Sequence, residues 1–277
     1  MQSAADVRAA AQSRLRWELL ANLVRKDLKV KYKSSTLGFV WTLANPVLYL
    51  AVFTLVFTYF LTNRVPYFPV YFMAGLLVWN FFSTAALSAT GSVVGSANLV
   101  KKVPFPRIVL PLASVGFAAV HFVLQMGVFA VFLLALYRHA FGPQLALLVP
   151  ALTVALVFTV AVSLLVASLN VAYRDVQHLL EVGLLAWFWL CPIVYPLSFV
   201  RAKLAPHGIF WVFMLNPMTS VIAAMQRAIY RDPAPLADGS YGFYLTWLGI
   251  AGVVSLALLA AGVWAFRRLE DSFAEEL

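Results

Sequence analysis

ALLVPALTVALVFTVAVSLLVASL, residues 146–169, is a mostly apolar stretch without a single charged side chain. A helix of about 20 such residues crosses the hydrocarbon core of a bilayer, which is about 30 Å thick. The stretch has counterparts along the chain, because Asp, Glu, Lys and Arg are also absent from residues 34–63, 65–100, 108–137, 182–200, 204–226 and 239–266. The sequence therefore predicts an all-α protein that crosses a membrane several times.

Composition agrees with this prediction. Hydrophobic residues make up 63% of the 277 residues, charged residues make up 11%, and the mean hydropathy is +0.87. The net charge is +9, but the basic residues flank the apolar runs instead of forming one patch. This pattern indicates anchors against anionic lipid and argues against nucleic acid as a partner. Because Cys191 is the only cysteine, neither an intrachain disulfide nor a metal site is expected.

We predict a cytoplasmic N-terminal region, residues 1–33, followed by a transmembrane domain, residues 34–277. Six spans are placed near 39–61, 70–92, 109–136, 146–169, 180–196 and 243–266. The further apolar run at 204–226 is interrupted by Asn216 and Pro217, and proline removes a backbone donor. The two halves are each too short to span, so we expect a re-entrant pair over 204–230 that enters and leaves on the outer face. Asn216 and Pro217 would then form an outer gate.

The distribution of basic residues leaves six and seven spans open. With six spans and a cytoplasmic N-terminus, 14 Lys and Arg residues lie inside and 6 outside. A seven-span arrangement gives 14 and 6 again. Both satisfy the tendency of cytoplasmic loops to be basic. The Asn-Pro break favours six spans, with both termini in the cytoplasm.

Residues 14–33 predict a basic amphipathic helix. Its apolar face carries Trp17, Leu20, Val24 and Leu28 at helical spacing, with Arg and Lys residues around them. Such a helix, with a tryptophan on its apolar side, is typical of the membrane interface. The alternative is a solvated cytoplasmic helix that packs on a partner.

The chemistry that this chain lacks limits its function. Residues 28–174 contain no acidic side chain, although ion-driven transporters usually need a carboxylate inside the membrane. The sequence contains no Gly-x-x-x-x-Gly-Lys-Ser/Thr loop for nucleotide phosphates, and no catalytic motif is evident. His121 and Gln125 share one helical face in the third span. They could touch a polar substrate, but an interhelical hydrogen bond is the commoner role.

Four stretches resemble one family, in the family's order. They are KYKSSTLGFVWTLANPVLYL (31–50), NLVKKVPFPRIVLPLA (98–113), NVAYRDVQHLLEVGLLAWFWLCPIVYP (170–196) and LNPMTSVIAAMQRAIY (215–230). They are similar to the permease subunit of type 2 ABC exporters of lipid-linked polysaccharide, such as O-antigen, teichoic-acid and galactan exporters. The second and third stretches are specific, whereas the first is shared with other type 2 ABC permeases.

The resemblance implies six spans, an N-terminal interface helix, and re-entrant helices between spans five and six. It also implies a homodimer in the bacterial cytoplasmic membrane, paired with two separate ATPase subunits that bind ATP and Mg. The chain itself would then be a permease and not an enzyme. Two rival functions are a type 2 ABC permease for drugs or lipids and a self-sufficient carrier or flippase.

The loop after the second span would, by resemblance, dock on the ATPase. The residues concerned are Gly95, Asn98, Leu99, Lys101 and Lys102, and the next cytoplasmic loop adds Arg174 and Asp175. Pro104 and Pro106 are expected to end the docking helix. Without the resemblance, a lysine pair at a membrane edge would be assigned to lipid phosphates.

A polysaccharide path is expected to expose aromatic rings, because the C–H faces of sugars pack on them. The first span offers Tyr49, Phe53 and Phe57, and the fifth offers Trp187, Phe188 and Tyr195. Trp187 and Trp189 lie about 200° apart on a helix, so at most one of them can face a channel. The alternative is that these aromatics pack inside the protein or anchor it at the interface.

Overall fold

The structure, a computed structural model, describes residues 4–33, 40–56, 67–102, 105–137, 141–230, 236, 239–270 and 273–276. Every regular element in these ranges is a helix, which confirms the predicted all-α class. Four helices are long and apolar enough to cross a membrane: Phe68–Thr90, Val109–Ala135, Pro143–Ala172 and Tyr241–Leu269. They correspond to four of the six predicted spans.

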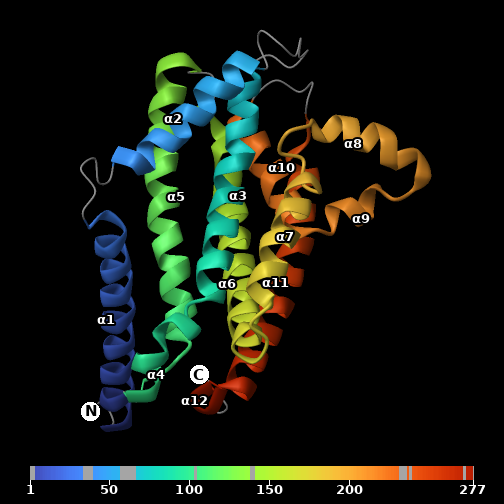
Figure 1. The fold of residues 1–277 in the computed structure, drawn as a ribbon. Helices are drawn as coiled ribbons and strands as arrows, with labels where there is room; N and C mark the ends of the chain where they lie inside the picture. Colours follow the sequence, from blue (N-terminus) through green and yellow to red (C-terminus); the bar gives the residue numbers. More distant parts are fainter. Residues whose placement is uncertain are drawn as a thin grey trace.

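These four helices form the bundle that the rest of the chain surrounds. They are α3 (Phe68–Thr90), α5 (Val109–Leu136), α6 (Leu148–Ala172, preceded by the 3-10 turn η4, Pro143–Leu147) and α11 (Tyr241–Leu269). Figure 1 shows them side by side, with both marked ends of the chain at the same end of the bundle. We call that end the lower end and the opposite one the upper end.

The first and fifth predicted spans are represented by shorter helices. α2 (Val40–Leu55) packs against α5 and α3, and most of the rest of the predicted first span, residues 57–61, lies outside the described residues. α7 (Val176–Trp189) is a 14-residue helix. The fifth span was predicted to continue to residue 196, but the helix ends at Trp189 because Pro192 and Pro196 lack the backbone donor that a helix needs. Six spans therefore stay a prediction.

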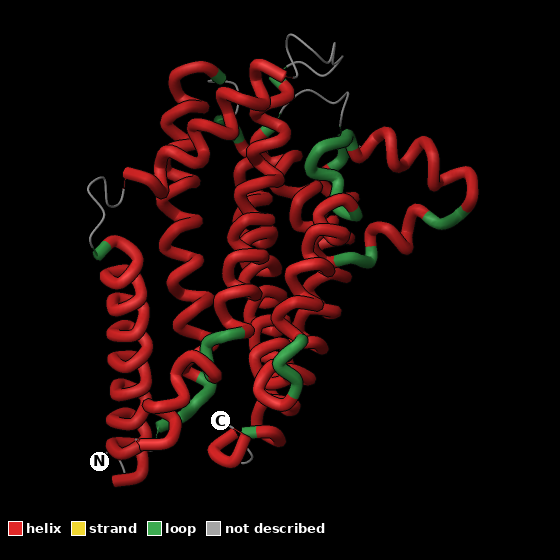
Figure 2. Tube along the Cα trace, viewed as in Figure 1, coloured by secondary structure: helices red, strands yellow, loops and turns green. Residues whose placement is uncertain are grey.

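The break predicted at Asn216 and Pro217 is confirmed as a boundary between two helices. α9 (Phe210–Met214) ends before it, and α10 (Pro217–Ile229) begins at Pro217. The Asn216 side chain accepts a hydrogen bond from the Met218 backbone N–H at 3.1 Å, which caps α10. Together α8 (Leu197–Leu204), the 3-10 turn η5 (Ala205–His207) and α9 form an arm that projects sideways from the bundle (Figure 2).

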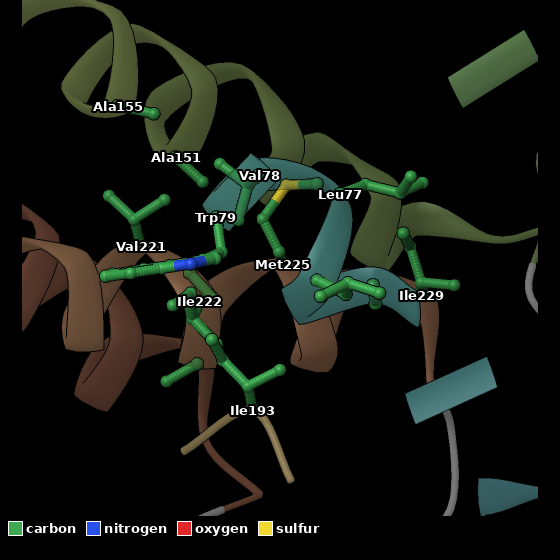
Figure 3. Packing of buried hydrophobic residues seen from close by; sticks show 14 of the residues in the cluster. Leu77, Val78, Trp79, Ala151, Ala155, Ile193, Val221, Ile222, Met225 and Ile229 are labelled. Atoms are coloured by element: carbon green, nitrogen blue, oxygen red, sulfur yellow. The ribbon is translucent and has the colours of Figure 1, made fainter. Parts of the chain in front are cut away.

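α3 is the central helix of the main core. Of its 23 residues, 17 are buried, because α5, α6 and α10 pack around it. α10 is enclosed as well, with 12 of its 13 residues buried. Figure 3 shows Val78 of α3 beside Ala151 of α6, and Leu77 of α3 beside Met225 of α10. The α3–α10 contact is tight at Gly75, where an added Cβ would lie 3.0 Å from Ile222 Cγ2.

A second, smaller core lies at the lower end. It buries Val100 of α4 (Ala97–Lys102) with Leu164 of α6, Phe266 of α11 and Phe273 of α12 (Phe273–Glu276). Next to it, the backbone N–H of Arg107 donates to Glu270 Oε1 at 3.0 Å, and the Arg107 guanidinium donates to the Glu270 carbonyl oxygen. The C-terminal segment is therefore attached to the chain that leads from α4 into α5.

Candidate functional site

The predicted docking residues form the exposed side of α4. This short helix follows α3 through a turn and the 3-10 turn η2 (Val94–Ser96), at the lower end of the bundle (Figure 1). The exposed residues here are Gly95, Asn98, Leu99, Lys101 and Lys102, whereas Val100 is turned into the second core. α4 thus combines an apolar anchor with an exposed face of one leucine, one asparagine and two lysines, which is suited to binding another protein.

The turn between α6 and α7 presents Arg174 and Asp175, which are both exposed. This turn is joined to the end of α3 by a buried side chain, Asn170. Asn170 Nδ2 donates to the Thr90 carbonyl oxygen at 3.0 Å, and Asn170 Oδ1 accepts from the Gln177 backbone N–H at 3.2 Å. One amide therefore connects the ends of α3 and α6 to the start of α7. Sequence reasoning missed this role, although Asn170 begins the third of the resembling stretches.

An open groove of 510 Å³ lies between α2, α3 and α7. It brings together three of the predicted channel residues, Tyr49, Phe53 and Phe188. The sequence did not indicate the polar residues of the groove, which are Asn80, Ser83 and Glu181. Only their position on the faces of α3 and α7 that border α2 could have identified them. Aromatic rings and hydrogen-bonding groups therefore share one surface.

The two tryptophans of α7 lie on different sides, as their spacing required. The Trp187 ring packs in the protein, with its centroid 5.2 Å from Phe82 and 5.9 Å from Phe158. Trp189 lines the groove instead and is 62% exposed. Trp187 was predicted as a channel residue, but its packing matches the alternative of an internal aromatic.

Another predicted channel residue, Tyr195, is not part of this groove. Tyr195 is half-buried beyond the end of α7, and its hydroxyl donates to the Trp189 carbonyl oxygen at 2.7 Å. Tyr195 therefore fixes the turn that follows the helix and is not part of the groove lining. Phe57 lies outside the described residues.

The predicted gate residues, Asn216 and Pro217, hold α10 in place. Besides capping α10, Asn216 donates from Nδ2 to Cys191 Sγ at 3.5 Å. Pro217 is buried at the first position of the helix, where a missing backbone N–H costs nothing. Gln226, farther along α10, donates from Nε2 to the Pro192 carbonyl oxygen at 2.8 Å. These bonds tie α10 to the chain that follows α7.

The amphipathic helix α1 (Ala4–Tyr32) packs against α5. Leu20, Val24 and Leu28 are partly buried, and an added Cβ on Gly116 of α5 would lie 2.9 Å from Val24 Cγ2. Trp17, in contrast, is 70% exposed. Figure 1 shows α1 running alongside the lower half of α5. Its apolar face is therefore covered in part by this chain, and contact with the membrane interface stays a prediction.

The fold and these surfaces define the chain as a polytopic helical membrane protein with an exposed helix at one end and an open aromatic groove. Comparison with known proteins gives the family. The description "ABC-2 type transporter" matches residues 18–230, so the chain belongs to that transporter family.

Individual relatives are matched over most of their length. The O-antigen export system permease protein RfbA of Myxococcus xanthus is 33% identical over 259 residues, which cover 94% of this chain and 95% of the relative. A protein of the same name from Klebsiella pneumoniae is 30% identical, with the same coverage. The polysialic acid transport protein KpsM of Escherichia coli is more distant, at 19% identity over 90% of this chain and 93% of the relative.

Proposed function

We propose that this chain is the membrane-spanning subunit of an ATP-driven exporter that moves lipid-linked polysaccharide across the bacterial cytoplasmic membrane. Membership of the ABC-2 type transporter family supports the transport role, and the names of the relatives support a polysaccharide cargo. The observation that carries the proposal is the groove between α2, α3 and α7.

The groove suits a sugar chain better than a compact apolar ligand. Its rings, from Phe53, Phe188 and Trp189, offer faces on which sugar C–H groups pack. Asn80, Ser83 and Glu181 add donors and acceptors for hydroxyl groups. An open surface of this kind tolerates successive sugars because few of its contacts demand one stereochemistry.

The energy for export would come from two separate ATPase subunits, which bind the ATP and Mg. The chain has no phosphate-cradling loop of its own. α4 would be the docking helix for these subunits, with Arg174 and Asp175 as a second contact. Because Val100 anchors α4 to the second core, a push on α4 would reach α6 and α11.

A second copy of the chain would complete the path. α7 has only Leu184 buried, and Leu179 and Leu185 are each 71% exposed. Apolar side chains in these numbers suit a second protomer or lipid and not water. In a homodimer, the α7 helices and grooves of two protomers would face a shared channel.

Docking is tested by Leu99→Asp, with Asn22→Asp on α1 as the control. Both variants add one carboxylate to an exposed position, but only the first puts it in the docking face, in place of an apolar contact. An unpaired charge at such a contact costs several kcal/mol, roughly 3 or more. We expect Leu99→Asp to insert normally and to lose the ATPase during detergent purification, while Asn22→Asp retains it. Equal retention would place docking elsewhere.

The dimer is tested by Leu179→Glu, with His178→Glu as the control on the neighbouring, exposed position. Native mass spectrometry should detect two permease chains in the wild type and in His178→Glu. Leu179→Glu should yield single chains with unchanged helix content. Intact dimers in Leu179→Glu would exclude this part of α7 from the interface.

Six spans with both termini in the cytoplasm are tested by cysteine labelling in a Cys191→Ser background. A cysteine at Ser240 should react with an impermeant thiol reagent in cells whose outer barrier is opened. A cysteine at Ser272 should not react. Reaction at Ser272 would establish seven spans and remove the proposed outward gate at Asn216 and Pro217.

The cargo is tested by purifying the exporter from its native membrane and analysing the bound lipid and partners by mass spectrometry. We expect two ATPase chains and a polyprenyl-linked glycan. A drug or an ordinary lipid as the only bound cargo would favour the rival ABC permease functions. Transport by the purified chain without any ATPase would favour a self-sufficient carrier.

A further inference from the structure

Two pairs of polar residues line a second cavity in the bundle, next to the aromatic groove. Asn80 and Thr84 are four residues apart on α3, and His121 and Gln125 are four apart on α5. Residues at this spacing share one face of a helix. All four line one cavity of 250 Å³. Because a water molecule occupies about 30 Å³ in the liquid, the cavity has room for a hydrated or charged group.

The cavity also receives side chains from the first two helices. Lys31, from the end of α1, and Tyr49, from α2, complete its polar lining. The Lys31 Nζ lies 5.1 Å from the centroid of the Phe117 ring on α5. Burial lowers the pKa of the Lys31 ammonium group below its ordinary value. Lys31 is still an exposed residue, so this cation beside α5 can be reached by a ligand.

The described lining of the cavity contains a cation, Lys31, but no acidic side chain. None of the described residues that line it is acidic, and the sequence contains no Asp or Glu between residues 28 and 174. A desolvated ammonium group gains most from an anion within reach. The amides of Asn80 and Gln125 and the hydroxyl of Thr84 can each donate a hydrogen bond to the same anion.

His121 is well placed within this set. It is 7% exposed, and its Nδ1 is 2.9 Å from the Phe117 carbonyl oxygen in the preceding turn. That contact holds the imidazole in one orientation on the cavity wall. The sequence had left two roles open for His121 and Gln125, and the shared cavity favours contact with a polar ligand.

We propose that this cavity binds the phosphate or diphosphate group of a membrane lipid, with Lys31 as the charged contact and Asn80, Thr84, His121 and Gln125 around it. The assignment rests on the proposed function for its choice of ligand, because the phosphate of a lipid-linked glycan is an anion next to an apolar tail. A neutral sugar would not explain a lysine in a cavity whose described lining contains no acidic residue.

The site and the groove share two residues, Tyr49 and Asn80. They come from α2 and α3, which separate the two spaces. A lipid phosphate held on one side of these helices would therefore place the attached glycan close to the aromatic surface on the other. The two sites would bind different parts of one substrate, with the charged group in the cavity and the sugars in the groove.

The test uses the full chain with its ATPase in nanodiscs of phosphatidylcholine. Farnesyl diphosphate is the probe, and farnesol, which lacks the phosphates, is its control. We expect the diphosphate to bind at least tenfold more tightly than farnesol. Inorganic pyrophosphate should compete with it, and phosphatidylglycerol nanodiscs should show whether an ordinary lipid headgroup also occupies the site.

Two lysines of α1 provide a matched pair of variants. Lys31→Gln should weaken farnesyl diphosphate binding at least tenfold, whereas Lys29→Gln should leave it unchanged, because Lys31 lines the cavity and Lys29 does not. Lys31→Arg should retain most of the affinity. Thermal unfolding of each variant checks that the fold is intact.

Equal binding by Lys31→Gln and Lys29→Gln would overturn the site, as would equal binding of farnesol and farnesyl diphosphate by the wild type. The second comparison needs no variant, so it decides even if Lys31→Gln fails to fold. An unchanged affinity for farnesyl diphosphate in phosphatidylglycerol nanodiscs assigns the site to the substrate carrier, and a tenfold loss of affinity there assigns it to lipid headgroups. Export of glycan by the wild type is measured separately, so loss of the site leaves the proposed function standing.

Discussion

α3 and α7 are both apolar and rich in aromatic residues, but α3 is enclosed by other helices and α7 is not. α3 has 17 buried residues and is surrounded by three helices, whereas α7 has one buried residue, Leu184. Hydrophobicity alone marks both as membrane helices. The difference indicates that α3 holds one protomer together, while α7 keeps its apolar surface for contacts outside the protomer.

The difference extends to the aromatic side chains. Phe82 of α3 packs within the protomer, while Trp189 of α7 is open to the groove. Trp187 is the exception on α7, because its ring reaches back to α3 and α6. It is one of the residues through which α7 is attached to α3, and its loss gives the largest effect that we expect.

Trp187→Ala should lower the free energy of unfolding by about 3 kcal/mol, because it empties a ring-sized space between α3, α6 and α7. Trp189→Ala should change it by less than about 0.5 kcal/mol, since that ring is mostly exposed. Thermal unfolding in detergent compares the two variants. A larger loss in Trp189→Ala would reverse our assignment of the two faces.

Glycines offer a second comparison of the same helices. In Gly75→Val the new Cβ would lie 3.0 Å from Ile222 Cγ2 and 3.1 Å from Gln226 Nε2, so α10 has to shift. We expect a loss of about 2 kcal/mol. An added Cβ at Gly183 of α7 meets no atom within 4 Å, so Gly183→Val should leave the stability of the protomer unchanged or slightly higher.

The melting temperatures of single chains carrying Gly75→Val or Gly183→Val compare the two variants. Native mass spectrometry reports any effect of Gly183→Val on assembly. A marked destabilisation of the single protomer by Gly183→Val would mean that α7 is more enclosed than its exposure indicates.

The joint between the two helices gives the smallest expected change in stability. Asn170→Ala removes hydrogen bonds to the Thr90 carbonyl oxygen and the Gln177 N–H, which should cost about 1–2 kcal/mol. Since Asn170 connects the end of α3 to the start of α7, we also expect less glycan exported per ATP hydrolysed. Asn22→Ala, at an exposed position of α1 outside the docking face, is the control. An unchanged ratio of export to hydrolysis would limit Asn170 to a structural role.

The sequence predicted the features that depend on local chemistry. The absence of charge over 146–169 identified a long helix, and Asn216 with Pro217 identified a helix boundary, because capping and the missing proline donor act within one turn. The end of α7 at Trp189 was missed, although Pro192 and Pro196 were visible in the sequence. The span was predicted from the hydrophobicity of residues 180–196, which hid the effect of these two prolines on the helix end.

Features that depend on packing between helices were not accessible in this way. The spacing of Trp187 and Trp189 showed that they face different ways, but the identity of the inward one depends on where Phe82 and Phe158 lie. Asn80 and Glu181 are about 100 residues apart in the chain and meet only in the folded groove. The Asn170 joint likewise connects three helix ends that the sequence does not place relative to one another.

The buried Phe273 has a practical consequence for anyone who expresses this protein. A fluorescent or affinity tag fused to the C-terminus would begin within a few residues of a side chain that is 1% exposed and packed beside Val100 of α4. Such a tag is a perturbation and not a neutral label, because strain on the tail would reach the exposed face of α4. A fusion at the N-terminus, or a long flexible spacer after the tail, avoids a false report of poor complex assembly.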